Sequence, residues 1–137
     1  MPKLSWAKEV KKYDQVFSQW IRLSEADDSG MVECFTCGTV KPWNQGMQAG
    51  HFVSRSHFSV RWLPFNVRPQ CVACNMFHQG RQYEFGQKLN RVYGDDMSEQ
   101  LLRQSKQPHQ YNAEQLKQMR LELQKEVDEL REAKHRG

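Results

Sequence analysis

The sequence predicts an α+β protein in which a small metal-stabilised core lies between an N-terminal and a C-terminal helix. Two Cys-x-x-Cys pairs fall within residues 31–94, and this stretch also holds six of the eight glycines and three of the five prolines. Residues 3–26 and 112–135 instead show apolar side chains at helical spacing. A length of 137 residues suits one domain. We therefore expect one compact unit with an extra constraint in its middle.

The N-terminal part, residues 1–30, is expected to be an amphipathic helix packed on the core. Lys and Glu separate the large apolar residues of this part, and "DDSG" at 27–30 is a turn signal that ends the helix. The apolar residues at helical spacing are Trp6, Val10, Tyr13, Phe17, Trp20, Ile21 and Leu23.

The core, residues 31–94, contains the strongest spacing signal. Cys34 and Cys37 form one pair, and Cys71 and Cys74 form the other. Tetrahedral zinc accepts four thiolates in this arrangement, so we predict a structural zinc site. A disulfide is the alternative, but it suits an intracellular chain poorly, and no βαβ pattern supports a thioredoxin-like motif. Residues 80–94 predict a short helix that glycine interrupts or ends.

The C-terminal part, residues 95–137, is expected to be a linker followed by a helix over 112–135. Asn112 is a candidate N-cap. Leu116, Leu123 and Leu130 recur every seven residues, which is an incomplete heptad pattern. This helix could pack on the domain or form a homodimer with a second copy, and the sequence leaves both open.

Charge is distributed unevenly along the chain. The net charge is only +4, but residues 41–91 hold seven Lys or Arg and a single acid, Glu84. Such a segment suits a polyanion such as nucleic acid, although a solvated basic face is the alternative. No run approaches the roughly 18 apolar residues of a membrane span, and the charged N-terminus is unlike a signal peptide. We therefore expect a soluble, intracellular protein.

His51, in "QAGHFVSR", lies between the two cysteine pairs, and taken alone it could be an ordinary buried ring. Its neighbours in order are more specific: Cys-x-x-Cys-Gly, Ala-Gly-His-Phe, Arg-Trp-x-x-x-Asn and Gln-Cys-x-x-Cys-Asn. Over roughly residues 34–94 this order resembles the HNH, or ββα-metal, nuclease superfamily, and most closely the NinG (Rap) recombination endonucleases of lambdoid phages.

The resemblance implies a treble-clef-like ββα-metal core with a catalytic Mg²⁺ or Mn²⁺ beside the structural zinc. It implies that His51 is the general base, that Asn66 holds the hairpin loop and helps to orient His51, and that Asn75 binds the catalytic ion. Many HNH enzymes carry an acidic ligand just before the histidine, where this chain has Gly50. His57 or His78, water or DNA phosphate could complete the metal shell.

The resemblance also implies a structure-specific DNA endonuclease that acts on branched recombination intermediates, namely D-loops and Holliday junctions, in the cytoplasm of a bacterial host. Arg55, Arg61, Arg68 and Arg81 are the candidate phosphate contacts, although each could instead be solvated or paired with the acidic terminal helices. Two alternatives stay open. One is a zinc-stabilised module that recognises junction shape without catalysis, and the other is a zinc protein that assembles partners through its terminal helix.

Overall fold

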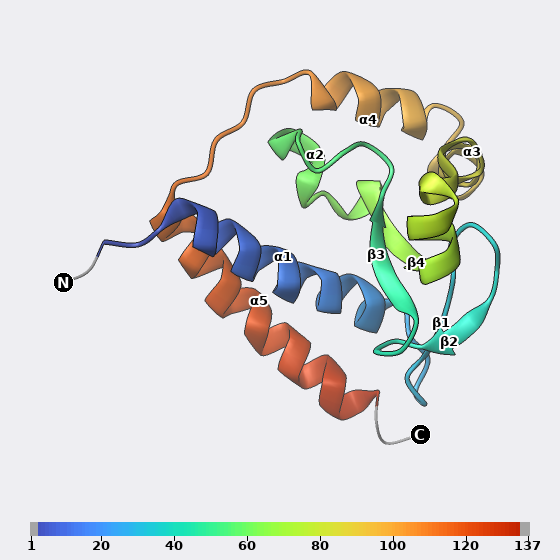
Figure 1. The fold of residues 1–137 in the computed structure, drawn as a ribbon, viewed down its shortest axis with the longest axis horizontal. Coiled ribbons are helices and arrows are strands. Elements are labelled where there is room, and N and C mark those ends of the chain that lie inside the picture. The colour runs from blue at the N-terminus through green and yellow to red at the C-terminus, as the bar shows by residue number, and fades with distance from the viewer. Residues whose placement is uncertain (1–2, 135–137) are drawn as a thin grey trace.

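The computed structural model describes residues 3–134, which form five α-helices and two antiparallel strand pairs (Figure 1). The α+β class is thereby confirmed. In the described part of the chain, no helix combines the length and the apolar character needed to cross a bilayer.

The first helix, α1 (Trp6–Ser24), confirms the helix expected over residues 3–26. It begins at Ser5, whose hydroxyl accepts a hydrogen bond from the Lys8 backbone N–H at 3.3 Å. After the helix, the Asp27 carboxylate accepts hydrogen bonds from the backbone N–H groups of Ser29 and Met31, each at 3.0 Å. These bonds build the turn that the sequence signalled and direct the chain into the first strand.

The last helix, α5 (Ala113–Ala133), confirms the C-terminal helix, and His135 of the expected range lies outside the described residues. Asn112 and Gln115 form a reciprocal capping box at its start. Helix α5 runs alongside α1 in the same direction, as Figure 1 shows. A buried ion pair between Arg120 and Glu9, 3.3 Å long, joins the two helices.

The heptad side of α5 faces α1 within the same chain. Leu116 is fully buried, and Leu123 and Leu130 are half-buried against the core. A second copy of the chain would therefore have to contact another face of α5, and a homodimer through this helix stays a prediction.

The two strand pairs lie between the helices. Strands β1 (Met31–Glu33) and β2 (Val40–Pro42) form a hairpin that presents the first cysteine pair in its turn. Strands β3 (Met47–His51) and β4 (Val67–Cys71) form the second pair, with Met47 opposite Cys71 and His51 opposite Val67. The connection from β3 to β4 contains helix α2 (Phe58–Arg61) and the short 3-10 turn η1 (Pro64–Asn66).

Beyond β4 the chain forms one turn of π-helix, η2 (Ala73–Phe77), a 3-10 turn, η3 (Gln79–Arg81), and helix α3 (Gln82–Tyr93). Helix α3 confirms the short helix expected within residues 80–94. Gly94, with φ of 128°, ends it. Gly86 does not interrupt it, and the Phe52 ring packs closely against Gly86, where a Cβ atom would lie 3.0 Å from the ring. The order β3, β4, helix is the order that a ββα core requires, and membership of that fold stays a prediction.

Helix α4 (Met97–Ser105) lies in the segment that the sequence analysis treated as a linker. Its buried Leu101 packs with Phe85 and Leu89 of α3. This cluster is one of three in the interior. A second surrounds the cysteines between α1, β1 and α5, and a third fills the space between α1, α5 and Trp62. The core thus fixes α1 beside the β3–β4 pair.

The packing of α5 on α1 makes a prediction for two leucines of the same helix. Leu116→Ala should lower the free energy of unfolding by about 2–5 kcal/mol because it opens a cavity between the helices. Leu121→Ala, at a position 44% exposed, should lower it by less than about 1 kcal/mol. Urea unfolding followed by circular dichroism measures both. Equal losses in the two variants would contradict the packing described here.

Candidate functional site

The four cysteines come together from three places in the fold. Cys34 and Cys37 lie in the β1–β2 turn, Cys71 ends β4, and Cys74 lies in η2. Their sulfur atoms all lie within 4.8 Å of one another, and the Sγ atoms of Cys37 and Cys71 are 3.7 Å apart. Four sulfurs around zinc at about 2.3 Å would be about 3.8 Å apart. None of the four forms a disulfide, so the cluster can hold one metal ion, as expected for structural zinc.

The turn between β1 and β2 is shaped for these sulfurs. Gly38 adopts a positive φ of 81°, and its N–H donates to the Cys34 carbonyl at 3.0 Å. Burial alone would raise the pKa of Cys34, but hydrogen bonds from the Cys71 backbone and the Thr36 side chain outweigh this and lower the pKa to about 6. A thiol that ionises easily is a suitable zinc ligand.

Arg81, one of the expected phosphate contacts, lies at this cluster instead. Its Nε donates a hydrogen bond to the Cys74 Sγ at 3.2 Å. The guanidinium charge lies next to sulfurs that carry negative charge as thiolates, so Arg81 would stabilise the ionised cluster.

Removal of metal from this cluster should unfold the core. We predict that each chain binds one zinc ion and that a strong chelator or the substitution Cys74→Ser releases it. Loss of the ion should lower the melting temperature by about 10 °C or more, because the β1–β2 turn and η2 are then no longer connected. Elemental analysis and a thermal melt measure both quantities, and re-addition of zinc to the chelated native chain should restore the melt. A chain that keeps its melting temperature without metal would contradict a structural role.

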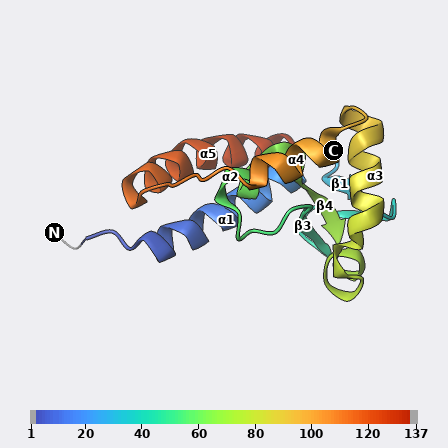
Figure 2. The same ribbon diagram turned by 90° about the horizontal axis from the view of Figure 1, so that it is seen from above.

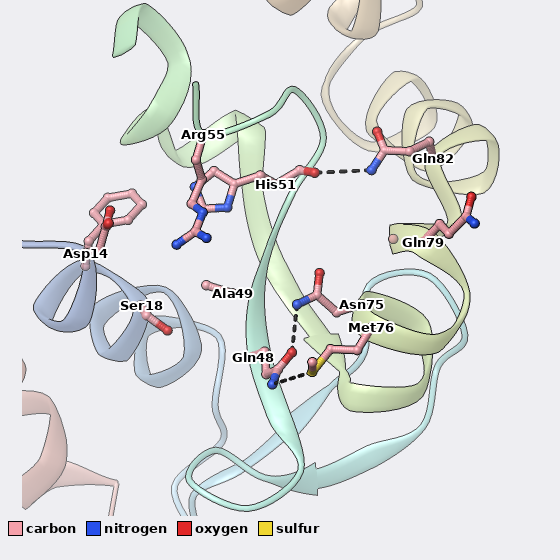
Figure 3. Close-up of a pocket in the computed structure, with 12 residues that line it drawn as sticks. Asp14, Ser18, Gln48, Ala49, His51, Arg55, Asn75, Met76, Gln79 and Gln82 are labelled. Carbon is pink, nitrogen blue, oxygen red and sulfur yellow. Dashed lines mark hydrogen bonds between the residues drawn. The ribbon is translucent and has the colours of Figure 1, made fainter. Parts of the chain in front are cut away.

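A pocket of about 560 Å³ opens along β3 (Figure 3). Gln48, Ala49 and His51 of β3 form its floor. One wall comes from α1, and the other comes from η2 and the residues after it. The wall residues are Asp14, Phe17 and Ser18 on the α1 side, and Asn75, Met76, Gln79, Gly80 and Gln82 on the other, with Arg55 at the loop after β3.

His51 is oriented by the backbone. Its Nε2 lies 2.9 Å from the Arg61 carbonyl oxygen. Because a carbonyl only accepts, Nε2 carries the hydrogen in this bond and Nδ1 keeps its lone pair. Burial lowers the pKa of His51 to about 4, so the ring is neutral at physiological pH. The pocket therefore contains a neutral imidazole with a basic nitrogen.

The end of α2, which supplies this carbonyl, is tied to α1. Asp14 accepts hydrogen bonds from the Arg61 Nε at 3.1 Å and from the Trp62 Nε1 at 2.8 Å, and its carboxylate is also ion-paired with the Arg61 guanidinium. Arg61, another expected phosphate contact, is thus occupied within the protein. Through it, Asp14 holds the carbonyl that orients His51.

Asn66 is fully buried and does not line the pocket. Its Oδ1 accepts from the Val53 N–H at 2.8 Å, and its Nδ2 donates to the carbonyls of Val53 and Val60, each at 3.0 Å. These bonds join the loop after β3 to α2. Asn66 therefore holds the loop after β3 in place. A contribution of Asn66 to catalysis stays a prediction.

Asn75 lines the same pocket as His51, but from the other side of β3. Its Nδ2 donates to the Gln48 Oε1 at 2.7 Å, and Figure 3 shows its own oxygen directed away from Gln48. Alternation along the strand explains the arrangement, because Gln48 and His51 point to opposite faces. A phosphate that touches both His51 and Asn75 would therefore lie across the edge of β3. His57 and His78 do not line the pocket.

Gly50 is required by close packing inside the β3–β4 pair. A Cβ atom at this position would lie 1.8 Å from the Gln70 Oε1. Gln70 is fully buried, and its Nε2 donates to the Gly80 carbonyl at 2.8 Å and to the Thr36 hydroxyl at 3.0 Å. No side chain, acidic or otherwise, fits before His51 while Gln70 holds this position. Gln70 was not among the predicted site residues, although a glycine inside a strand is a known sign of close approach.

The fit of Gln70 over Gly50 can be measured with a double-mutant cycle. Gly50→Ala should lower the free energy of unfolding by about 2 kcal/mol or more, because Gln70 must leave its buried hydrogen bonds. In a Gln70→Ala background the same change should cost less than about 1 kcal/mol. Chemical unfolding of the four proteins gives the coupling energy. A coupling near zero would contradict the direct contact.

A resident catalytic ion fits the described residues poorly. Apart from the four cysteines, no group of three His, Cys, Asp or Glu side chains in residues 3–134 could hold a metal. Asp14 is the carboxylate of the pocket, and it is already bonded to Arg61 and Trp62. Mg²⁺ is usually held by one or two carboxylates together with water and substrate phosphates. The Asn75 oxygen alone would leave most of the shell to water and phosphate.

The remaining two expected phosphate contacts have different surroundings. Arg55 lines the pocket, and Figure 3 shows it beside the His51 ring. Arg68 is buried on β4, where it is ion-paired with Glu25 at 3.1 Å and donates to the Tyr93 hydroxyl at 2.7 Å. Of the four arginines, the structure brings Arg55 alone to the pocket, and DNA contact by any of them stays a prediction.

Comparison with known proteins gives one match. The model of the family described as bacteriophage lambda NinG protein matches residues 2–134, which is nearly the whole chain. No curated protein and no solved structure matched.

Proposed function

This chain belongs to the bacteriophage lambda NinG family, and from that premise we propose that it is a metal-dependent DNA endonuclease acting in phage recombination. Its substrates would be branched intermediates, namely D-loops and Holliday junctions. The observation that carries the proposal is the neutral, backbone-oriented His51 in an open pocket with Arg55 beside it.

In this proposal His51 removes a proton from the attacking water through Nδ1, because Nε2 is occupied by the Arg61 carbonyl. A pKa of about 4 makes the ring a weak base in the free protein. A DNA phosphate near the ring adds negative charge, which favours the imidazolium and raises the pKa. His51 would thus become a stronger base when DNA is bound.

Arg55 and Asn75 would position the phosphate. The Arg55 guanidinium can neutralise part of its charge on the α1 side of β3, and the Asn75 oxygen faces the other side of the pocket. A Mg²⁺ or Mn²⁺ ion would be held by water and DNA phosphate together with the Asn75 oxygen, and the chemistry it would supply is neutralisation of phosphate charge. Zinc bound to the four cysteines would have a structural role only, because it would fix the position of η2 and therefore of Asn75.

One observation favours a second candidate, a zinc-stabilised module that binds DNA junctions without cleaving them. The pocket lacks a carboxylate that is free to hold a divalent ion, because Asp14 is bonded to Arg61 and Trp62. In that case the same pocket and arginine would bind the phosphate backbone, and His51 would be a buried structural ring.

Cleavage of a synthetic four-way junction tests the proposal. With Mg²⁺ or Mn²⁺ present, the native chain should cut the junction in preference to a linear duplex of matched sequence. His51→Ala should lower the rate by about 100-fold or more because the base is lost. The matched control is His57→Ala, whose histidine lies outside the pocket and should keep the native rate. Gel assays measure cleavage, and elemental analysis confirms that each variant retains zinc.

The junction assay also separates the two candidates. Junction binding without cleavage by the native chain, with either ion, would favour the non-catalytic module. A native rate in His51→Ala would contradict the role given to this histidine.

A further inference from the structure

Three large apolar side chains within residues 76–83 are exposed, and the first of them, Met76, lines the pocket. Met76 is 62% exposed, Phe77 is 76% exposed and Tyr83 is 73% exposed. Phe77 and Tyr83 are the two most exposed large hydrophobic residues among those that the structure describes. We refer to Met76, Phe77 and Tyr83 as the apolar tip. Hydrophobic side chains at this exposure, gathered in one short segment, indicate a binding surface.

The backbone holds this tip away from the body of the protein. Gln79, Gly80 and Arg81 have φ of 53°, 77° and 45°, so three consecutive residues adopt the left-handed region. Two of them are not glycine, and such strain persists only where the surrounding structure enforces it. Figure 2 shows the yellow-green η2 and η3 segment projecting beyond the β3–β4 pair, on the side away from α5.

The strained turn is fixed by buried contacts. The Gly80 carbonyl accepts from the buried Gln70, and Arg81 donates to Cys74 of the metal cluster. The turn between Phe77 and Tyr83 is therefore tied to the core at two points. A rigid mounting lets an exposed ring bind without a large loss of conformational freedom.

The apolar tip also borders the pocket that contains His51. Met76 lines this pocket, and its sulfur accepts from the Gln48 Nε2 at 3.5 Å. Gln82, next to Tyr83 in the chain, donates to the His51 carbonyl at 3.2 Å. A ligand with a group in the pocket would extend directly onto the tip.

The charges around the tip indicate what that ligand is. Arg55 lines the adjoining pocket, and the one carboxylate among the lining residues, Asp14, is ion-paired with Arg61. The ligand should therefore combine negative charge with flat apolar groups. Unpaired nucleotides have both, because each base has a π-face and each phosphate a charge, and aromatic side chains stack on bases whatever their sequence.

We propose that the apolar tip stacks on unpaired bases of branched DNA while the adjoining phosphate lies in the His51 pocket. The branch point of a junction, D-loop or fork leaves bases partly unstacked, and a rigid apolar wedge can insert there. A continuous duplex offers no such face. The tip would thus give the protein its preference for branched over linear DNA. This inference rests on the proposed function of the pocket.

Binding measured without cleavage tests the inference independently of catalysis. His51→Ala, without added Mg²⁺, is titrated into a forked DNA that carries 2-aminopurine at the first unpaired position, and into a linear duplex of matched sequence. Phe77→Ala in this background should bind the fork about 5- to 100-fold more weakly and change the fluorescence less, while duplex affinity changes less than about twofold. Tyr83→Ala should act in the same direction.

Two controls identify stacking as the cause. Phe77→Leu keeps apolar surface without a π-face, so its fork affinity should resemble that of Phe77→Ala. Val92→Ala, at an exposed position on α3 outside the tip, should keep full affinity. Circular dichroism of each variant should match the parent, since the altered side chains lie on the surface.

Unchanged fork affinity in Phe77→Ala would overturn the inference, and if the native chain still cuts junctions the proposed nuclease function would stand. Equal losses on fork and duplex would also overturn it, because the tip would then not select branched DNA. A smaller molecular mass of Phe77→Ala than of its parent in sedimentation would also overturn the inference. The tip would then form a contact between copies of the chain. Absence of DNA binding by the parent would reject both proposals.

Discussion

The convergence of four cysteine sulfurs is the constraint on which the rest of the core depends. The sulfurs join the turn between β1 and β2 to the junction between the end of β4 and the start of η2. Neither hairpin is large enough to be stable alone in water. The cysteine cluster includes Cys74 at the start of η2, next to Asn75 of the pocket, and Arg81 donates a hydrogen bond to Cys74.

Polar side chains also stabilise the loops, where they form hydrogen bonds with backbone groups that have no partner in a helix or strand. Asn66 uses its amide to hold the loop after β3, and Gln70 uses its amide to hold the turn after η2. Both side chains are fully buried, so each substitutes for main-chain partners that these irregular segments lack. Buried amides thus help to hold the loop after β3, which carries Arg55, and the turn that follows η2 on one wall of the pocket.

Much of the architecture could be predicted from local sequence. Helices α1 and α5 follow from apolar spacing, with Asn112 as the cap of α5, and the cysteine cluster follows from cysteine spacing. Helix α4 was missed because its nine residues carry few apolar positions, and burial of Leu101 becomes evident only once α3 is in place. The close fit of Gln70 over Gly50 depends on strand register, which sequence alone does not specify.

The four arginines show most clearly what could not be predicted from the sequence. All four lie in the same basic segment, yet Arg61 and Arg68 are paired with Asp14 and Glu25, which precede that segment by many residues. Charge composition predicted the excess of cations over residues 41–91 but could not show which of them are neutralised within the fold. Asp14 itself had no signal in the sequence, because a carboxylate on a mixed-charge helix is ordinary.

The position of Asp14 on α1 has a consequence for how this protein can be divided. Residues 31–94 contain the cysteines, His51 and Asn75, and by sequence they resemble a self-contained module. One wall of the pocket and the anchor of the His51 loop nevertheless come from α1, and α1 is covered by α5. The pocket is thus lined in part by the N-terminal helix, which the C-terminal helix in turn supports. The segment that carries the chemistry could not be transplanted into another protein without the helices that flank it.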